Sequence, residues 1–361
     1  MAVFRLTMFP ARDGDCLLVS YGSEDKRGAL RHLLVDGGRR SAYALLKPRL
    51  KQIANAGEKL ELLVLTHIDA DHIEGLLALG EDADRPIAPG QVWFNGYDQM
   101  DKVQAFGERQ GDAYSAQLAA LRWPINTVFD GGAVSIEAKP DPFIFAGLRI
   151  TLLSPDKEKL RIMRDRWANW RTLEAAKEAA KALRRQAAGG LQRMGRKPMP
   201  PVLDVATLAE ATPTDPEPPN GSSIAFVAEW MGKRILLAGD AHPGLLAESL
   251  APLAAAGGGR YSIDLFKISH HGSHGNTTRE VVERLDCRRF AVSSNGNLHG
   301  HPDPQAIARL LAFSPAGPKT LYFNYPPTAW TGPWNDAALR AKHDYACIYP
   351  AGADEPLTID V

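Results

Sequence analysis

The densest group of chemically versatile side chains lies in the segment LVLTHIDADHIEG, residues 63–75. Four side chains that can bind a cation fall within six positions, directly after an apolar run: His67, Asp69, Asp71 and His72. Without a cation, such a cluster would crowd charged groups together and remove part of their hydration, which costs free energy. Imidazole nitrogens and carboxylate oxygens are common ligands of divalent metals. The segment therefore predicts a metal site, and a purely structural role is a weak alternative.

Further polar side chains also follow apolar runs. They are Asp36 in LLVDGG, Asp240 in LLAGDA, His270, His271 and His274 in KISHHGSHGN, and His299 and His301 in NLHGHP. Taken singly, an aspartate after a strand is often a turn former, and a pair of histidines is often only solvated. Ligand sites of open α/β folds lie at the carboxyl ends of strands, so we expect these groups to meet in one site.

Hydroxyl and amide side chains near these motifs are candidates for substrate binding. The segment HGSHGNTT precedes a predicted helix that starts at Thr278, and helix amino termini attract anions. The alternative role of each such residue is capping or turn formation. The predicted substrate contacts are Ser222, Ser223, His271, Ser273, Asn276, Asn295 and His299.

The elements that must position these residues form two similar halves. In the first, β-rich runs start at Val3, Cys16, His32 and Leu60, with a helical stretch over 41–56. The second half has such runs from Phe143, Ser222, Gly232, Ile263 and Arg289. The apolar strands of both halves need each other to complete two buried faces. We therefore interpret residues 1–361 as one domain of the α+β or α/β class, with residues 157–219 as a helical insertion and proline-rich connector.

Composition restricts the cellular setting. Lysine plus arginine equals aspartate plus glutamate at 42 each, so the net charge predicts neither a polyanionic nor a membrane partner. The three cysteines lack CxxC spacing, which argues against disulfides and a cysteine zinc site. We expect no secretion signal, no membrane span and a cytoplasmic location.

The insertion has an unusual local charge. Residues 157–197 contain thirteen lysines and arginines against four acids, and Trp167 and Trp170 lie among them. This excess makes nucleic acid a possible partner. The alternative is a solvated helix face whose tryptophans pack on the core, as their heptad-like spacing with Leu160 and Met163 suggests.

The order of the motifs resembles the metallo-β-lactamase superfamily of hydrolases, whose signature is HxHxDH after a strand, followed by Asp and His ligands at later strand ends. The segments NGSSIAF, LLAGDA, FKISHHGSHGNTT and SSNGNLHGHP look most like the ComEC-type branch, named for the hydrolase domain of the bacterial competence DNA-uptake protein. The resemblance runs from Val3 to Pro302 and implies an αββα sandwich.

The resemblance also implies a set of metal ligands. His67, Asp71 and His72 match the first motif, and the other matches are Asp240 to the bridging aspartate, His270 to the late histidine and Asp36 to the residue that braces the ligand turn. Two departures stand out: Asp69 replaces the second histidine of HxHxDH, and no histidine occurs between His72 and His242. We therefore expect one secure metal site and a second, weak or empty site. The secure site would use Asp71, His72, Asp240 and His270, and the weak one His67 and Asp69.

The expected chemistry is hydrolysis. Zinc or manganese would be the divalent metal, and the carboxylate at Asp69 shifts the preference toward manganese. A bound metal lowers the pKa of water to about 7, and Asp71 or Asp69 would orient that water while His301 protonates the leaving oxygen or binds an anion.

Three functional hypotheses follow. The leading one is a nuclease or phosphodiesterase that acts on DNA or RNA, as the ComEC-type resemblance implies. The second is a hydrolase of a small phosphodiester or signalling nucleotide, and the third is a non-catalytic, metal-stabilised interaction protein. Hydrolysis of β-lactams is the weakest interpretation because the branch resemblance points elsewhere.

Overall fold

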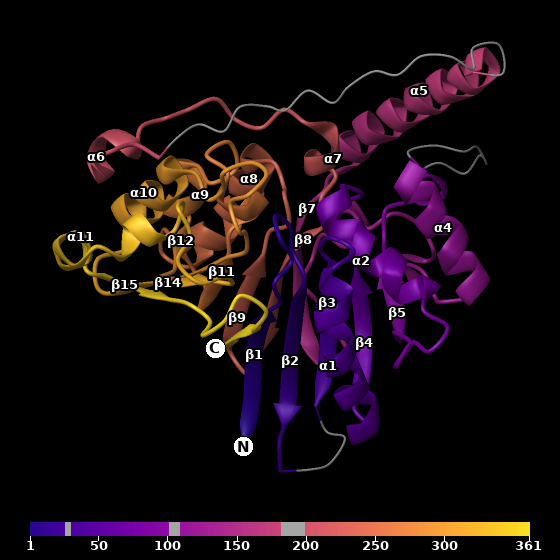
Figure 1. The fold of residues 1–361 in the computed structure, drawn as a ribbon, viewed down its shortest axis with the longest axis horizontal. Helices are drawn as coiled ribbons and strands as arrows, with labels where there is room; N and C mark the ends of the chain where they lie inside the picture. Colours follow the sequence, from indigo (N-terminus) through magenta and orange to yellow (C-terminus); the bar gives the residue numbers. More distant parts are fainter. Residues whose placement is uncertain (26–29, 101–108, 182–198) are drawn as a thin grey trace.

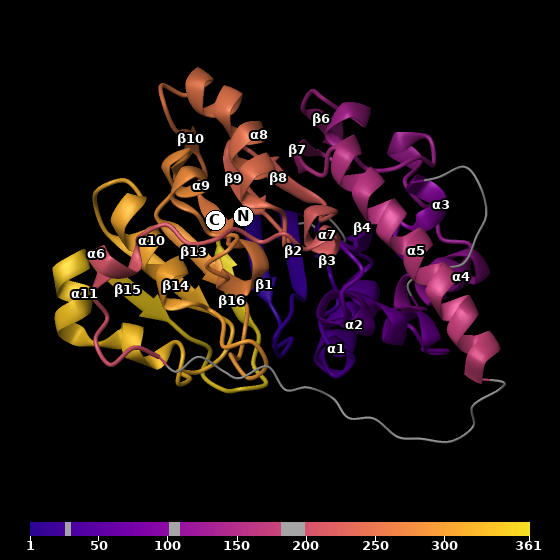
Figure 2. The same cartoon turned by 90° about the horizontal axis from the view of Figure 1, so that it is seen from above.

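Two β-sheets pack face to face at the centre of the protein, and helices cover their outer faces (Figure 1 and Figure 2). The structure is a computed structural model that describes residues 1–25, 30–100, 109–181 and 199–361. Within these ranges, one sheet has the strand order β16-β1-β2-β3-β4-β5 and the other β15-β14-β13-β11-β9-β8-β7-β6. This is the αββα sandwich, so the predicted fold class is confirmed.

The first sheet contains β1 (Ala2–Met8), β2 (Leu17–Ser23), β3 (Arg31–Val35), β4 (Lys59–Val64), β5 (Gln91–Trp93) and β16 (Leu357–Asp360). The second contains β6 (Phe143–Phe145), β7 (Leu148–Ser154), β8 (Ala225–Trp230), β9 (Lys233–Leu237), β11 (Leu265–Lys267), β13 (Arg289–Val292), β14 (Lys319–Phe323) and β15 (Tyr345–Ile348). The short strands β10 (Tyr261–Ser262) and β12 (Leu285–Asp286) pair with each other.

The α-helices are α1 (Ala42–Ala56), α2 (Ala70–Glu81), α3 (Tyr97–Met100), α4 (Arg109–Leu121), α5 (Lys157–Lys181), α6 (Val205–Leu208), α7 (Pro218–Gly221), α8 (Pro243–Ala256), α9 (Arg279–Glu283), α10 (Pro304–Phe313) and α11 (Ala337–His343). Single 3-10 turns occur at η1 (Thr127–Phe129), η2 (Ile136–Ala138), η3 (Ser269–Gly272) and η4 (Gly332–Asn335).

Each predicted β-rich run contains a strand, and the predicted helix over 41–56 is α1. The run from Phe143 differs from the prediction because it forms two strands, β6 and β7. A turn with positive φ at Ala146 and Gly147 separates them. Strands β5, β10, β12, β14, β15 and β16 were not predicted, and each has only two to five residues.

The inner core takes side chains from both sheets. Trp93 at the end of β5 lies at its centre, with its ring 5.4–6.1 Å from the rings of four phenylalanines, Phe129, Phe143, Phe145 and Phe226. Aromatic pairs at such distances add to the stability gained from burial. Because neither sheet has a complete core alone, we continue to interpret the chain as one folding unit.

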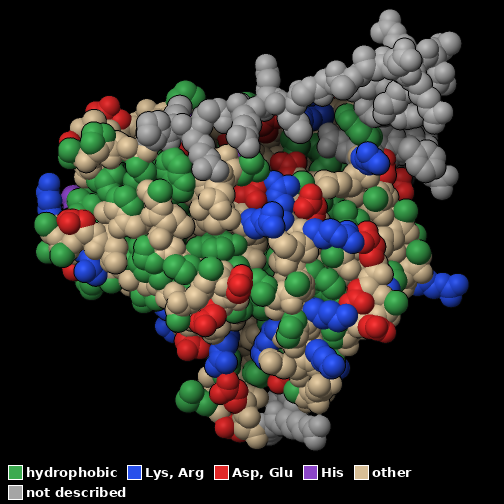
Figure 3. Space-filling model, viewed as in Figure 1, with side chains coloured by type: hydrophobic (Ala, Val, Ile, Leu, Met, Phe, Trp, Pro, Cys, Tyr) green, Lys and Arg blue, Asp and Glu red, His purple; other side chains and the backbone are tan. Residues whose placement is uncertain are grey.

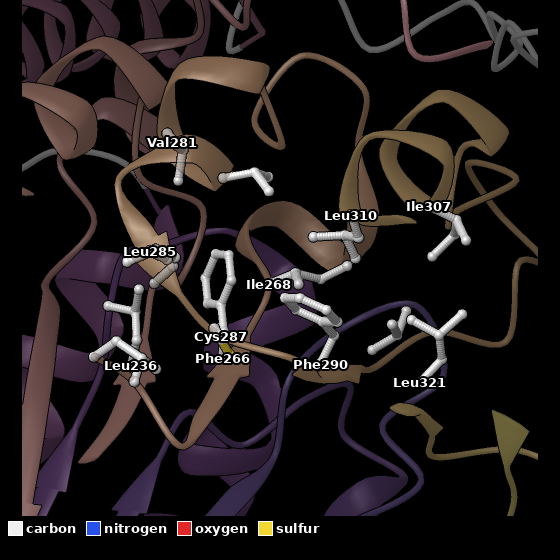
Figure 4. Packing of buried hydrophobic residues seen from close by; sticks show 14 of the residues in the cluster. Leu236, Phe266, Ile268, Val281, Leu285, Cys287, Phe290, Ile307, Leu310 and Leu321 are labelled. Carbon is white, nitrogen blue, oxygen red and sulfur yellow. The ribbon is translucent and has the colours of Figure 1, made fainter. Parts of the chain in front are cut away.

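The outer cores hold the helices against the sheets. Helices α1, α2 and α4 pack on the first sheet, and α8, α9 and α10 pack on the second. Figure 4 shows part of the second outer core, where Leu236 and Phe290 from the strands face Val281 and Leu310 from α9 and α10. The strands of both sheets are therefore fixed on two faces, and their ends are held in place.

Parallel strands bring the polar motifs to common edges. Strands β3 and β4 are parallel neighbours, as are β9, β11 and β13. Asp36 follows β3 and His67 follows β4, whereas Asp240 and the histidine pair follow β9 and β11. Parallel strands end at the same edge of a sheet, so these residues gather there as expected.

The insertion lies between β7 and β8, which are antiparallel neighbours in the second sheet. Its helix α5 runs along the top of the view in Figure 1. Leu160, Met163 and Trp167 are buried, and the Trp167 ring packs against Tyr97 of α3. Trp170 is only partly buried. Residues 182–197 of the predicted basic segment lie outside the described residues.

Two further expectations concern cysteines and membranes. Cys16, Cys287 and Cys347 are all described and are free thiols, in agreement with the sequence. Among the described residues, no helix is both long and apolar enough to cross a membrane.

Two glycines allow the backbone after β3 to touch the first turns of α2. The Gly37 N–H donates to the His72 carbonyl at 2.8 Å, and the Gly75 N–H donates to the Gly38 carbonyl at 2.9 Å. A Cβ at Gly75 would lie 1.9 Å from the Gly37 carbonyl oxygen. The sequence motifs DGG and HIEG are therefore parts of one backbone contact that locates His72.

We predict that Gly75→Ala destabilises the protein, although alanine is the better helix former by about 1 kcal/mol. The new methyl group would force backbone apart, and such overpacking costs about 1–3 kcal/mol. Gly244→Ala in α8 is the matched control because nothing lies within 4 Å of its Cβ position. Urea unfolding of both variants provides the test, and equal midpoints would contradict the prediction.

Candidate metal centre

The ligand turn begins directly after β4 and ends in α2. Asp69 is the N-cap residue of α2, and the N–H of His72 donates to the Asp69 carbonyl at 2.9 Å. His67 and His72 are 3% and 0% exposed, and their ring centroids lie 4.2 Å apart. The Asp69 side chain is 45% exposed, with Oδ2 at 3.6 Å from His67 Nε2. The turn thus presents two buried imidazoles and one accessible carboxylate.

Asp36 braces this turn from the end of β3. Its carboxylate accepts hydrogen bonds from the Thr66 N–H at 2.7 Å, from the Thr66 hydroxyl at 2.8 Å and from His72 Nδ1 at 2.8 Å. A carboxylate accepts only, so Nδ1 of His72 carries the proton and Nε2 is left to act as an acceptor or a ligand. This is the position that the resemblance implies for Asp36.

The second sheet contributes Asp240 and the histidine pair. Asp240 follows β9 and is 2% exposed, with its N–H donating to the Ser223 hydroxyl at 3.1 Å. His270 and His271 follow β11 with φ of 48° and 53°. The left-handed region is costly for residues other than glycine, and strain of this kind concentrates at functional sites. Consecutive left-handed residues turn both imidazoles toward Asp240.

The donor atoms converge on one oxygen. Asp240 Oδ2 lies 3.7, 3.5, 3.6 and 3.7 Å from the Nε2 atoms of His67, His72, His270 and His271 respectively. Ligands at 2.0–2.1 Å from a tetrahedral metal are separated by about 3.3 Å. His67 Nε2 and Asp240 Oδ1 are buried and have no hydrogen-bond partner among the described residues. The donor set and its spacing fit a divalent metal.

Asp71 completes the group from the first turn of α2. Its Oδ2 lies 3.4 Å from His271 Nε2 and 3.8 Å from His72 Nε2. The structure therefore brings together all the predicted ligands, namely His67, Asp69, Asp71, His72, Asp240 and His270.

His271 was predicted to contact the substrate, but in the structure it lies among the metal-binding side chains. It is 1% exposed, its Nε2 lies 3.2 Å from His72 Nε2, and it belongs to the donor cluster. The sequence pattern HH does not show which ring faces the metal position. The backbone angles decide it, and they place His271 beside Asp71, where the sequence interpretation had placed His270.

The charges around the donor side chains shift the pKa values of these groups in the direction opposite to the effect of burial. Burial lowers the pKa of His72, but the carboxylates of Asp240 and Asp36 outweigh it and raise that pKa well above its usual value. Burial is likewise outweighed at His271, where Asp240 and Asp15 raise the pKa to about 10. Burial raises the pKa of Asp240, but the surrounding imidazoles lower it well below the usual range. Binding of a divalent cation in this negative field would displace protons from the imidazoles.

Sequence reasoning missed the pair that supports His271. Lys267 of β11 is fully buried and donates from Nζ to Asp15 Oδ2 at 2.7 Å, while Asp15 Oδ1 lies 3.4 Å from His271 Nδ1. The Ser293 carbonyl also lies 3.1 Å from His271 Nδ1. The available signal was a lysine inside the apolar run LFKIS, which predicts a buried partner of opposite charge.

Asp215 was missed as well. It lies in the proline-rich connector, and its Oδ2 accepts hydrogen bonds from Asn220 at 2.7 Å and from Asn276 at 3.0 Å. The same oxygen lies 3.2 Å from His270 Nδ1. The segment PTDPEPPNG reads as a linker, and nothing in its sequence indicates a contact with the histidine pair.

Several predicted substrate contacts make hydrogen bonds inside the protein. The Ser222 hydroxyl donates to the Pro219 carbonyl, and the hydroxyls of Ser223 and Ser273 accept from the N–H groups of Asp240 and Gly275. Asn276 donates to the Asp240 carbonyl at 3.1 Å and lies 3.0 Å from His270 Nδ1. These side chains shape the site, and their contact with substrate remains a prediction.

The remaining candidates lie on the loop after β13. His301 has its ring 5.4 Å from that of His270 and 5.9 Å from that of His299. Burial lowers the pKa of His301, and Asp303, with Oδ2 at 3.5 Å from Nδ1, offsets this only in part. His299 is exposed, and the Asn295 N–H donates to the Arg12 carbonyl at 2.7 Å. His299 and His301 thus form an imidazole row that leads from the surface to the donor cluster.

Comparison with known proteins finds one family model that is similar to the part of the chain containing the ligand turn. Residues 26–147 match the family model of the metallo-beta-lactamase superfamily. This match includes the ligand turn but not Asp240 or the histidine pair. No curated protein sequence matches the chain significantly.

Two solved structures align with the chain. One is a mutant of CmlA beta-hydroxylase, at 12% identity and a TM-score of 0.38, with 100% of this chain and 54% of that chain covered. The chain therefore spans about half the length of that protein. The other is Zn(2+)-bound PqqB from Methylobacterium extorquens, at 13% identity and a TM-score of 0.41, with 99% and 100% covered.

We predict that Asp36→Asn weakens metal binding about 10–100-fold, the usual effect of losing a carboxylate behind a ligating histidine. Whichever way the amide turns, its NH2 group meets a donor. If it faces His72, that ring must move its proton from Nδ1 to Nε2, the atom that faces Asp240. Competition with a chromophoric chelator measures the affinity.

Asp264→Asn is the control for this change because Asp264 pairs with Lys233 at the surface. Both variants should keep the circular dichroism spectrum of the parent. Unchanged metal affinity in folded Asp36→Asn protein would show that Asp36 does not set the His72 tautomer.

Proposed function

We propose that this chain, with the superfamily match over residues 26–147, is a metal-dependent hydrolase that cleaves phosphodiesters. The observation that carries the proposal is the convergence of imidazole and carboxylate donors on Asp240. A purely structural role of these histidines does not explain why four Nε2 atoms surround one buried carboxylate oxygen. A set of donors at metal-ligand spacing that includes the partly exposed side chains of Asp69 and His270 fits a catalytic metal site.

A divalent cation held by these donors would supply Lewis acidity and an activated water. The residues of the chain would then position the reacting groups. Asp69, with its partly exposed carboxylate, is placed to orient a water or accept its proton, and Asp71 faces the same donors. His301 is placed to donate a hydrogen bond to the leaving oxygen or to an anionic group of the substrate.

Zinc and manganese are the candidate metals, and we favour manganese. Three carboxylates, Asp69, Asp71 and Asp240, take part in the donor group, and oxygen ligands suit manganese and magnesium better than zinc. The ComEC-type resemblance supports phosphodiesters as the substrate class, because that branch is named for a protein of DNA uptake.

Nucleic acid is our first candidate substrate because of the basic excess in residues 157–197. One observation favours a small phosphodiester as the second candidate. In the first turns of α5, Arg161 and Arg164 pair with acids of the same helix, and Arg166 pairs with Glu217. Charges of both signs are also interspersed over the face in Figure 3. The start of α5, up to Arg166, therefore offers less free positive charge than its sequence suggests.

Single-turnover assays on labelled DNA, RNA and a cyclic dinucleotide test the proposal. We expect cleavage that a chelator abolishes and that manganese restores at least as well as zinc. Asp240→Ala should lose both metal and activity, because no other carboxylate at that turn can replace it. If metal-saturated protein cleaves none of the three phosphodiesters, the proposed activity is wrong.

The insertion can be tested separately by charge reversal. Replacing Lys177 and Lys181 of α5 with glutamate should weaken DNA binding and flatten its salt dependence, because each lost phosphate contact lowers the slope by about 0.9 for duplex DNA. Cleavage of bis(p-nitrophenyl) phosphate should be unchanged. Reversal of Lys51 and Lys59, which are exposed on the first half of the chain, is the matched control. A salt slope equal to that of the parent would favour the small-substrate hydrolase.

A further inference from the structure

The donor group is too large for one metal ion. Seven side chains contribute oxygen or nitrogen atoms within 3.8 Å of another member of the group. A tetrahedral ion takes four ligands, and a larger shell still includes water at a catalytic site. The seven side chains of this donor group are His67, Asp69, Asp71, His72, Asp240, His270 and His271.

Four of these side chains form a compact set. His72 Nε2, His271 Nε2 and Asp240 Oδ2 make a triangle with edges of 3.2, 3.5 and 3.7 Å. Asp71 Oδ2 lies 3.4 and 3.8 Å from the two imidazole nitrogens of this triangle. These edges are close to the separation of about 3.3 Å expected around a tetrahedral metal. One ion would therefore use Asp71, His72, Asp240 and His271.

The remaining side chains, His67, Asp69 and His270, adjoin the same Asp240 oxygen, Asp69 by way of His67. His67 Nε2 lies 3.6 Å from Asp69 Oδ2 and 3.7 Å from Asp240 Oδ2, and His270 Nε2 lies 3.6 Å from the same Asp240 oxygen. His67 Nε2 and Asp240 Oδ1 are both buried and lack a hydrogen-bond partner among the described residues. Unpartnered buried polar atoms are costly, and they indicate that these atoms face a ligand.

His270 is held as metal-binding histidines usually are. Its Nδ1 lies 3.2 Å from Asp215 Oδ2 and 3.0 Å from Asn276 Oδ1, so Nδ1 carries the proton and Nε2 faces Asp240. A carboxylate behind the imidazole fixes the ring and raises its strength as a ligand. His72 has the same arrangement with Asp36. His270 and His72 thus each have a carboxylate behind Nδ1 and direct Nε2 toward Asp240.

We propose that His270, held by Asp215, replaces the histidine that is missing between His72 and His242, and that it completes a second metal position with His67, Asp69 and Asp240. Asp240 would then belong to both positions. The site that the sequence predicted to be weak, with His67 and Asp69, thus gains the imidazole of His270. The site predicted to be secure uses His271 in place of His270. The insertion supplies the supporting carboxylate, since Asp215 lies on its connector. This inference rests on the proposed metal binding but not on the substrate.

Titration of the metal-free protein with Mn²⁺, followed by the EPR signal of the free ion, tests the assignment without any activity measurement. The parent protein should bind two ions, one tightly and one more weakly. His270→Ala should weaken the second ion at least tenfold and leave the first within twofold. His271→Ala should instead weaken the first. His343→Ala, on α11, is the control for loss of a histidine.

Asp215→Asn provides a milder test should His270→Ala fail to fold. It should weaken only the second ion, by about 10–100-fold, because His270 keeps its ring but loses the carboxylate behind it. Glu217→Gln is the matched control on the same connector, since that side chain pairs with Arg166.

Four outcomes would overturn the inference. They are a single bound ion in the parent at millimolar Mn²⁺, two unaffected ions in His270→Ala, loss of the tight ion in His270→Ala, and equal binding by Asp215→Asn and its control. Unaffected ions in His270→Ala would make His270 a substrate contact. No binding by the parent at all would also contradict the proposed function, so the two failures can be distinguished.

Discussion

The buried carboxylate of Asp240 is the constraint on which the rest of the structure depends. A desolvated anion needs compensating charge, and four imidazole nitrogens supplied by two sheets surround it. The strands of each sheet must therefore end where their following histidines can reach Asp240. The surrounding structure must also keep these histidines close together although protonated imidazoles repel one another. The glycine contact between Gly37 and Gly75 and the strained backbone of the histidine pair both serve this requirement.

Support behind the imidazoles is uneven, and the unevenness has a physical meaning. His72 has the Asp36 carboxylate and His270 has Asp215, whereas the partner of His67 Nδ1 within the described ranges is the Thr66 hydroxyl, at 3.1 Å. A hydroxyl can donate or accept, so it does not fix the tautomer of the ring. The tautomer of His67 is therefore the least fixed among the three rings, which agrees with the more weakly bound second ion that we propose.

The sequence predicts what depends on short stretches of chain. The ligand turn could be recognised because its four polar groups lie within six residues, and the fold class followed from strands with continuous apolar runs. Contacts between distant segments could not be recognised. Asp15 and Lys267 are 252 residues apart, and Asp215 meets His270 only after the insertion returns to the second sheet. The choice between His270 and His271 depends on backbone angles, which two adjacent identical residues do not reveal.

The Asp215 contact also affects how chimeras of this protein would behave. Exchange of the segment 157–219 for the corresponding loop of another hydrolase is an obvious way to transfer substrate preference, because loops on a sandwich scaffold tolerate replacement. Here the graft would remove the carboxylate that orients His270. Loss of activity in such a chimera could then result from a disturbed metal centre or from a lost recognition surface. Retaining Asp215 and Asn220 at the junction would separate the two effects, since Asn220 holds Asp215 in place.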